Sequence, residues 1–161
     1  MPAQEQKTEK RIFAVLVDNE PGVLARVVGL FSGRGYNIES LTVTEVDVAK
    51  HLSRITIVSS GTAQVPVHRV SDLTNEYAGN YVERETALVK VAGGGERRVE
   101  ALRIADIFKA EPVDAGLEHF VFQLTHRPEK LDRFIELMRP LGLVDVSRTG
   151  VVAISRGAKG I

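Results

Sequence analysis

The sequence contains no cysteine and few aromatic residues, and each shortage excludes a class of protein. Without cysteine there are no disulfides, thiolate nucleophiles or cysteine-ligated metals. Aromatic residues make up only 6% of the chain and no aromatic-glycine RNA motif occurs, which argues against an RNA-binding sheet. No apolar run approaches the roughly 20 residues that cross a bilayer. The sequence therefore argues against a cysteine-dependent enzyme or metal site, an RNA-binding sheet and a membrane-spanning helix.

Neither sign of charge is in excess. Lys and Arg total 21, Asp and Glu also total 21, and the formal net charge is zero. This balance argues against nucleic acid or an anionic membrane as the main partner. The length of 161 residues suggests one or two small domains. The start, "MPAQEQKTEK", is polar and lacks the apolar core of a signal peptide, so we expect a short disordered leader and a cytoplasmic protein.

The first half alternates strand and helix signals. Residues 11–18 form an apolar, β-branched run that predicts a strand buried on both faces. Asp18 or Asn19 can cap the helix that follows, and Pro21 suits its first turn. The helix has one apolar face and ends near two glycines; the residues concerned are Val23, Leu24, Val27, Val28 and Phe31, then Gly33 and Gly35. Further strands are expected at 37–47, 53–60 and 65–73.

The second half repeats this scheme. Expected elements are a strand at 85–92, a helix at 96–110, a hairpin at 112–126, a helix at 127–142 and two short strands within 143–157. The first helix is expected to bury Val99, Leu102, Ile104, Ile107 and Phe108. The second is expected to bury Leu131, Phe134, Ile135, Leu137 and Met138.

The order of elements predicts an α+β protein with two ferredoxin-like βαββαβ domains. We place the domains at 11–73 and 85–157, with a linker at 74–84. An open sheet of this kind carries its helices on one face, and another subunit or domain commonly covers the other.

The first domain has a gap. Only residues 60–64 separate its third and fourth strands, although parallel strands need a crossover of about a dozen residues. The domain therefore lacks its second helix, either by deletion or because residues are missing from the sequence. We predict that residues 60–70 are irregular or displaced, and that apolar surface near Val15, Val43 and Ile57 is left uncovered.

No catalytic or metal-binding pattern stands out. The histidines at 51, 68, 119 and 126 have no metal-ligand spacing, and no nucleophile elbow or carboxylate pair occurs. "VAGGGERR" resembles an anion-binding glycine turn, but it lacks the residues of a P-loop or dinucleotide motif, so a plain turn is favoured. Arg97 and Arg98 are expected on a solvated helix face. We predict no catalytic residue and no metal ligand in this chain.

The stretch "VLVDNEPGVLARVVGLFSGRGYNIESLTV" (15–43) carries the functional signal. A helix start offers unpaired N–H groups and partial positive charge, and Gly22 would let a small carboxylate approach them. The amides of Asn19 and Asn37 could hold the rest of an amino acid. The residues alone fit equally well an ordinary capped helix with a turn glycine.

This stretch closely resembles the ACT domain of the acetolactate synthase (acetohydroxyacid synthase) small-subunit family. "HLSRITIV", "VERETALVKVA", "RVEALRIADIF" and "PEKLDRFIELMRPLGLVDVSRTGVVAISRG" extend the likeness over nearly all of the chain after residue 10. The resemblance implies a noncatalytic regulatory subunit in branched-chain amino-acid biosynthesis, which activates a catalytic subunit and confers feedback inhibition, usually by valine. The domain at 11–73 would then be an effector-binding ACT domain.

The resemblance also implies a site and partners. Its effector-binding residues would be Asn19, Gly22, Val23 and Leu24, with Asn37 and Ile38 from the facing subunit of a homodimer paired through ACT domains. The chain itself would hold no cofactor, and thiamine diphosphate, Mg²⁺ and FAD would lie on the large catalytic subunit. The alternative is a stand-alone ACT-type amino-acid-binding module that regulates another enzyme.

Overall fold

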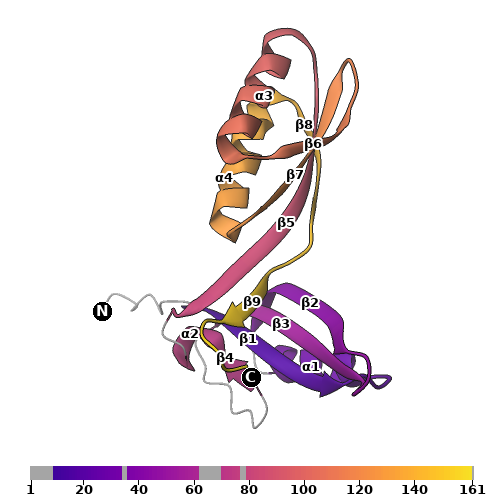
Figure 1. Cartoon of the computed structure of the whole chain (residues 1–161), viewed down its shortest axis with the longest axis vertical. Coiled ribbons are helices and arrows are strands. Elements are labelled where there is room, and N and C mark those ends of the chain that lie inside the picture. Colours follow the sequence, from indigo (N-terminus) through magenta and orange to yellow (C-terminus); the bar gives the residue numbers. More distant parts are fainter. Residues whose placement is uncertain (1–8, 34–35, 62–69, 77–78, 161) are drawn as a thin grey trace, which may run out of the picture. The chain divides into compact units, whose positions relative to one another are not determined.

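The chain forms two compact units (Figure 1). The computed structural model describes residues 9–33, 36–61, 70–76 and 79–160. The first unit contains the described residues up to Val82 together with the chain from Val151 onward, and the second contains Glu83–Gly150. No helix in the described part is long and apolar enough to cross a membrane.

The first unit is an antiparallel sheet with a helix on one face. Its strands are β1 (Glu9–Asp18), β2 (Asn37–Asp47), β3 (Leu52–Gly61) and β4 (Val70–Asp72), in the order β2-β3-β1-β4. Helix α1 (Val23–Ser32) joins β1 to β2, and the four-residue α2 (Leu73–Glu76) follows β4. This strand order is the ferredoxin-like order predicted from the sequence.

Strand β1 is buried on both faces, as its apolar run predicted. On the face toward α1, Phe13 and Val15 pack with Val27 and Phe31. On the opposite face, Ile12 and Ala14 join a second cluster that contains Val58, Leu73, Val151 and Ala153. Alternate side chains point to opposite sides of a strand, so a continuous apolar run requires cover on both.

The cover on the face opposite α1 includes the last strand of the chain, β9 (Val152–Ser155). Ser40 Oγ accepts a hydrogen bond from the amide of Val151 at 2.8 Å, and Thr42 Oγ1 donates to the Val151 carbonyl at 3.1 Å. Arg54 Nη2 donates to the Ala153 carbonyl at 2.7 Å. The predicted second domain, 85–157, thus includes a strand that packs in the first unit, and this chain itself covers part of the face expected to need a partner.

Among the described residues, no helix lies between β3 and β4. The prediction that 60–70 is irregular is wrong at its ends, because Ser60 and Gly61 continue β3 and Val70 begins β4. Residues 62–69 lie outside the described part. The predicted exposure is wrong for Val15 and Ile57, which α1 covers, whereas Val43 is 43% exposed at the edge strand β2.

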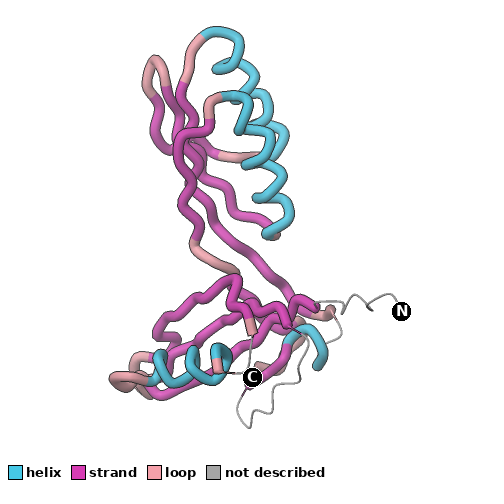
Figure 2. Tube along the Cα trace, turned by 180° about the vertical axis from the view of Figure 1, so that it is seen from behind, coloured by secondary structure: helices cyan, strands magenta, loops and turns pink. Residues whose placement is uncertain are grey.

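The second unit repeats the fold with both helices present. Its elements are β5 (Tyr81–Ala92), α3 (Gly95–Phe108), β6 (Glu111–Ala115), β7 (His119–His126), α4 (Pro128–Met138), a 3₁₀ turn η1 (Arg139–Leu141) and β8 (Leu143–Arg148). The strand order is β6-β7-β5-β8, and Figure 2 shows both helices on one side of the strands. The predicted ferredoxin-like order is confirmed here too.

The inward face of α3 differs in part from the prediction: Phe108 is buried and Ile104 packs against the core, as predicted, but alanines take the remaining places. Ala101, Ala105 and Phe108 are buried, whereas Val99, Leu102 and Ile107 are 50%, 39% and 73% exposed. Large rings already fill the core beneath the helices: Phe134 lies 5.4 Å from Phe108 and 6.1 Å from Phe122, measured between ring centroids. Small alanines therefore suit the inner face of α3. Apolar residues surround much of this helix, so periodicity did not define its buried side.

The prediction for α4 is largely confirmed. Leu131, Phe134, Ile135 and Met138 are buried, and Leu137, which is 41% exposed, is the one misplaced residue. Pro128 stands at the first turn of this helix, where a missing N–H costs nothing.

Candidate functional site

The turn between β1 and α1 is tied to the neighbouring hairpin. The Asn19 amide donates to the His51 carbonyl at 2.7 Å, and the Glu20 amide donates to the Asp18 carbonyl at 2.8 Å. Neither Asp18 nor Asn19 caps the helix, contrary to prediction, because the chain turns before α1 starts and Gly22 occupies the N-cap. The helix start therefore has no side-chain cap.

Gly22 leaves the start of α1 open. Its φ of +82° lies in the left-handed region that favours glycine, and a Cβ added there would meet nothing within 4 Å. The Gly22 carbonyl accepts from the Arg26 amide at 3.1 Å, which closes the first turn. Within the described part of the chain, the amides of Leu24 and Ala25 have no acceptor. Open space, free N–H groups and the helix dipole together suit a small carboxylate.

The structure brings together only part of the predicted site. Asn19, Gly22, Val23 and Leu24 lie at one turn, beyond the end of β1 where Asp18 pairs with Leu52. Asn37 begins β2 and pairs with Ser60, eight residues further along β3. At about 3.3 Å a residue, these two ends of the sheet are roughly 26 Å apart. Asn37 and Ile38 of the same chain therefore cannot share one small ligand with Gly22.

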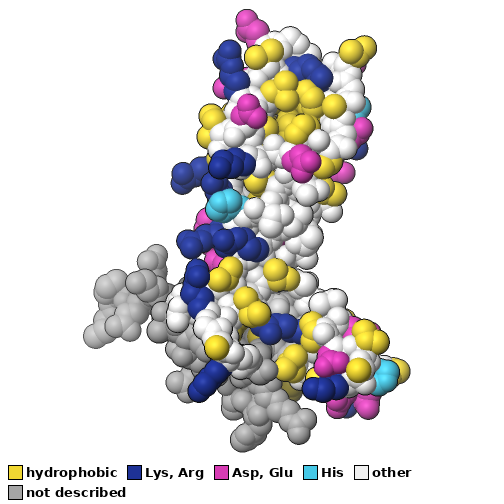
Figure 3. Space-filling model, in the orientation of Figure 1, with side chains coloured by type: hydrophobic (Ala, Val, Ile, Leu, Met, Phe, Trp, Pro, Cys, Tyr) yellow, Lys and Arg dark blue, Asp and Glu magenta, His cyan; other side chains and the backbone are white. Residues whose placement is uncertain are grey.

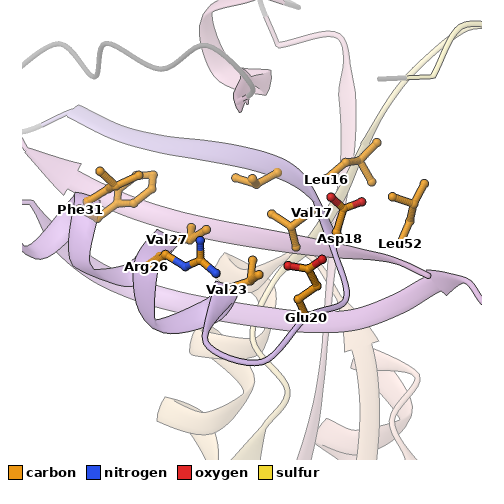
Figure 4. Close-up of a pocket in the computed structure, with 11 residues that line it drawn as sticks. Leu16, Val17, Asp18, Glu20, Val23, Arg26, Val27, Phe31 and Leu52 are labelled. Atoms are coloured by element: carbon orange, nitrogen blue, oxygen red, sulfur yellow. The ribbon is translucent and has the colours of Figure 1, made fainter. Parts of the chain in front are cut away.

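A cavity of about 400 Å³ lies against α1 and β1 (Figure 4). Apolar side chains from both elements line it, namely Val15, Val17, Val23, Val27, Leu30 and Phe31. Charged groups stand at the end near the start of α1. Figure 4 shows the carboxylates of Asp18 and Glu20 and the guanidinium of Arg26 around Val23. None of these three charged groups forms an ion pair with another described residue.

The charged groups of the cavity complement a small zwitterion. Carboxylates of Asp18 and Glu20 can accept from an ammonium group, and Arg26 can donate to a carboxylate. The valine-rich lining offers room for an aliphatic side chain. Sequence reasoning named Val23 in this region but missed the three charged residues. They stand within "DNEPGVLAR" itself, so their clustering around one turn was the available signal.

The other candidates from the sequence have structural roles. Gly93 donates its amide to the Glu118 carbonyl at 2.7 Å, which ties the glycine segment to the residues just before β7. Arg98 is not on a solvated face, because its guanidinium lies 3.9 Å from the centre of the Phe120 ring. His119 bonds Asp114 at 2.8 Å. No group of three potential ligands that could hold a metal occurs in the described segments; His68 lies outside them.

Two family models match the chain. One, described as the AHAS small subunit-like ACT domain, matches residues 13–71, and the other, described as the small subunit of acetolactate synthase, matches residues 84–157. The chain is similar to the probable acetolactate synthase small subunit of Archaeoglobus fulgidus, with 43% identity over 93% of this chain and 99% of the relative. It is similar to the acetolactate synthase isozyme 3 small subunit of Salmonella typhimurium, with 42% identity over 93% and 98%.

A solved structure shows the same fold. The crystal structure of the acetolactate synthase small subunit from Thermotoga maritima matches with a TM-score of 0.78 and 32% identity, over 94% of this chain and 99% of that one. The alignment with the Archaeoglobus relative shows a difference in length. It spans 160 positions but includes only 93% of the 161 residues here, about 150. The relative thus has about ten residues without a counterpart in this chain. That difference is the size of a short helix.

Proposed function

The chain belongs to the family of acetolactate synthase small subunits, and from this premise we propose that it activates the catalytic subunit and makes that subunit sensitive to feedback inhibition by valine. The resemblance expected from the sequence is thereby confirmed. A small subunit with an ACT domain is a regulatory component of branched-chain amino-acid biosynthesis. The observation that carries the proposal is the open start of α1 at Gly22.

The start of α1 can hold the main chain of an amino acid. The ligand carboxylate lies over Gly22 and accepts from the amides of Leu24 and Ala25. The side-chain oxygens of Asn19 and of a partner's asparagine accept from its ammonium group, and the nearby carboxylates of Asp18 and Glu20 favour its positive charge. Val23 and Leu24, which is 41% exposed, supply apolar surface for a branched side chain.

The dimer we propose explains how Asn37 reaches this site. Strand β2 is an 11-residue edge strand of the described sheet, and its unpaired edge can join a second copy. Antiparallel pairing of two β2 strands about Thr42 sets Asn37 of one copy opposite Asp47 of the other. Asp47 pairs with Leu52, so it stands at the same end of the sheet as the start of α1. Asn37 and Ile38 from the facing subunit then complete the pocket.

Leu41 and Val43 support this dimer. They are 37% and 43% exposed on β2, opposite Ile57 and Ile55 of β3, and therefore on the face that carries α1. Pairing through β2 would remove both from water, which stabilises the dimer by roughly 25 cal/mol for each Å² of apolar surface buried.

The catalytic chemistry is assigned to the partner. We place thiamine diphosphate, Mg²⁺ and FAD on the large subunit and none on this chain. We also place the complex in the cytoplasm, where its relatives' biosynthetic role would be carried out.

An acetolactate assay tests the proposal. The catalytic subunit is measured alone and with this chain, over a series of valine concentrations. We expect the chain to raise the rate and valine to lower it again. If the chain leaves both the rate and its valine response unchanged, the proposal is wrong.

A further inference from the structure

A second hollow, of about 530 Å³, lies in the second unit between the end of α3 and the start of α4. Phe108 lines it from α3, and the remaining lining residues are His126, Arg127, Glu129, Lys130 and Arg133. Three cations thus surround one carboxylate. Figure 3 shows Lys and Arg side chains gathered around a histidine on one side of this unit. We call this feature the basic hollow.

The cations of the basic hollow lack the acidic partners that some other arginines of the unit have. Arg103 pairs with Glu100, and Arg139 pairs with Glu136. Arg127, Lys130 and Arg133 form no ion pair with any residue that the structure describes. With Glu129 as one carboxylate against three cations, the hollow keeps a net positive charge, and an anion entering it would meet cations that have no ion-pair partner.

The surroundings of the histidine beside these cations disfavour its protonation. Burial, and then the charges of Lys130, Arg84 and Arg127, lower the pKa of His126. Its Nδ1 accepts a hydrogen bond from the Arg127 amide at 2.8 Å. In the neutral ring Nε2 then carries the proton and can donate to an anion.

The cations follow the axis of α4. Arg127, Lys130 and Arg133 are three residues apart, so they line one side of its first turns over roughly 9 Å of axis. Lys130 Nζ lies 5.8 Å from the centre of the Phe108 ring, which holds it over the apolar wall. The positive end of the helix dipole adds to their field.

We propose that the basic hollow binds a small anion with linked phosphate groups. The two guanidinium forks and the Lys130 ammonium suit phosphate oxygens, and their spread along α4 suits linked phosphates better than one. A concave site with charges around its wall fits a compact ligand better than the flat surface of a protein partner. This site is separate from the start of α1 and requires no amino-acid effector.

Titration calorimetry of the full chain with inorganic diphosphate tests this proposal, with citrate as a carboxylate probe. The test variant is Lys130→Gln with Arg133→Gln. The matched control is Arg97→Gln with Arg103→Gln, which removes the same charge from exposed positions on α3. Circular dichroism checks that each variant is folded.

We expect saturable binding of one diphosphate per chain, about tenfold weaker in the test variant and unchanged in the control, with citrate at least about tenfold weaker. Absence of diphosphate binding overturns the proposal, as does an equal loss in both variants, which would indicate a net-charge effect. Equal binding of citrate overturns the phosphate class. If the test variant binds diphosphate normally but loses the catalytic subunit, the hollow is a protein contact and the proposal is wrong.

Discussion

Replacing Gly22 with aspartate places a carboxylate at the proposed effector site. Because a Cβ at this position meets nothing within 4 Å, the fold can accept the side chain without a clash. The left-handed φ of +82° costs about 1 kcal/mol for a residue with a side chain. A negative charge at a helix start stabilises the helix by about 0.5 kcal/mol, so the net change in folding free energy is small.

The effect on the ligand is much larger. With the two carboxylates about 5 Å apart and an effective dielectric constant of about 20, their repulsion is about 3 kcal/mol. That energy corresponds to a loss of about a hundredfold in valine affinity. The new carboxylate also competes for the amides of Leu24 and Ala25, which adds to the loss.

The assay is acetolactate formation by the catalytic subunit with Gly22→Asp, across valine concentrations. We expect the concentration for half inhibition to rise about a hundredfold while activation remains. Gly29→Asp is the matched control, because it adds the same charge to an exposed position of α1 with open space around it. Gly29 lies seven residues, or roughly 10 Å, along the helix from Gly22, so a charge there is largely screened from a ligand bound at the helix start. An unchanged valine response in Gly22→Asp would show that the effector binds elsewhere.

Three further outcomes are expected. Asn37→Ala should weaken valine inhibition about tenfold, since an ammonium hydrogen bond is worth about 1.5 kcal/mol; inhibition curves that superimpose with the unmodified chain would remove Asn37 from the site. Arg148→Ala should lower the unfolding free energy of the second unit by about 2 kcal/mol, because it leaves the buried Glu85, bonded at 2.8 and 2.9 Å, without its cation. Urea titration measures this loss and that of the control Arg139→Ala, which removes an exposed ion pair and should cost under about 0.5 kcal/mol. Equal losses of unfolding free energy in the two variants would contradict the role given to the buried pair. In a dilute monomer, amides in 11–58 should exchange faster than those in 85–150, because the first unit depends more on its dimer partner; equal protection would contradict this.

The sequence predicted the strands well because burial on two faces has a local signature. The run at 11–18 is apolar throughout, and β1 is covered on both sides. The order of strands and helices then followed from the spacing of the apolar residues, which alternates in strands and recurs every three or four residues in helices. The inward face of α3 was predicted only in part. Val99, Leu102 and Ile107 have helical spacing as the alanines do, and which set is buried depends on the size of the aromatic rings in other elements.

Contacts between distant segments could not be predicted from local patterns. Ser40 and Val151 are 111 residues apart, and nothing near either shows that one bonds the other. The prediction of the helix cap was wrong for a similar reason. Asp18 and Asn19 have side chains that can cap a helix, but Gly22 takes the N-cap, after a turn that the hydrogen bond from the Asn19 amide to the His51 carbonyl holds in place. The sequence also singled out Gly22, which has a positive φ and open surroundings; its part in effector binding stays a prediction.

The most direct test of the account measures acetolactate from pyruvate in three samples: this chain alone, the catalytic subunit alone, and the two together over a range of valine concentrations. We expect no product from the chain alone, a higher rate in the mixture than with the catalytic subunit alone, and loss of that rate as valine rises. Robust turnover by the purified chain alone, or a mixture whose rate valine does not change, would contradict it.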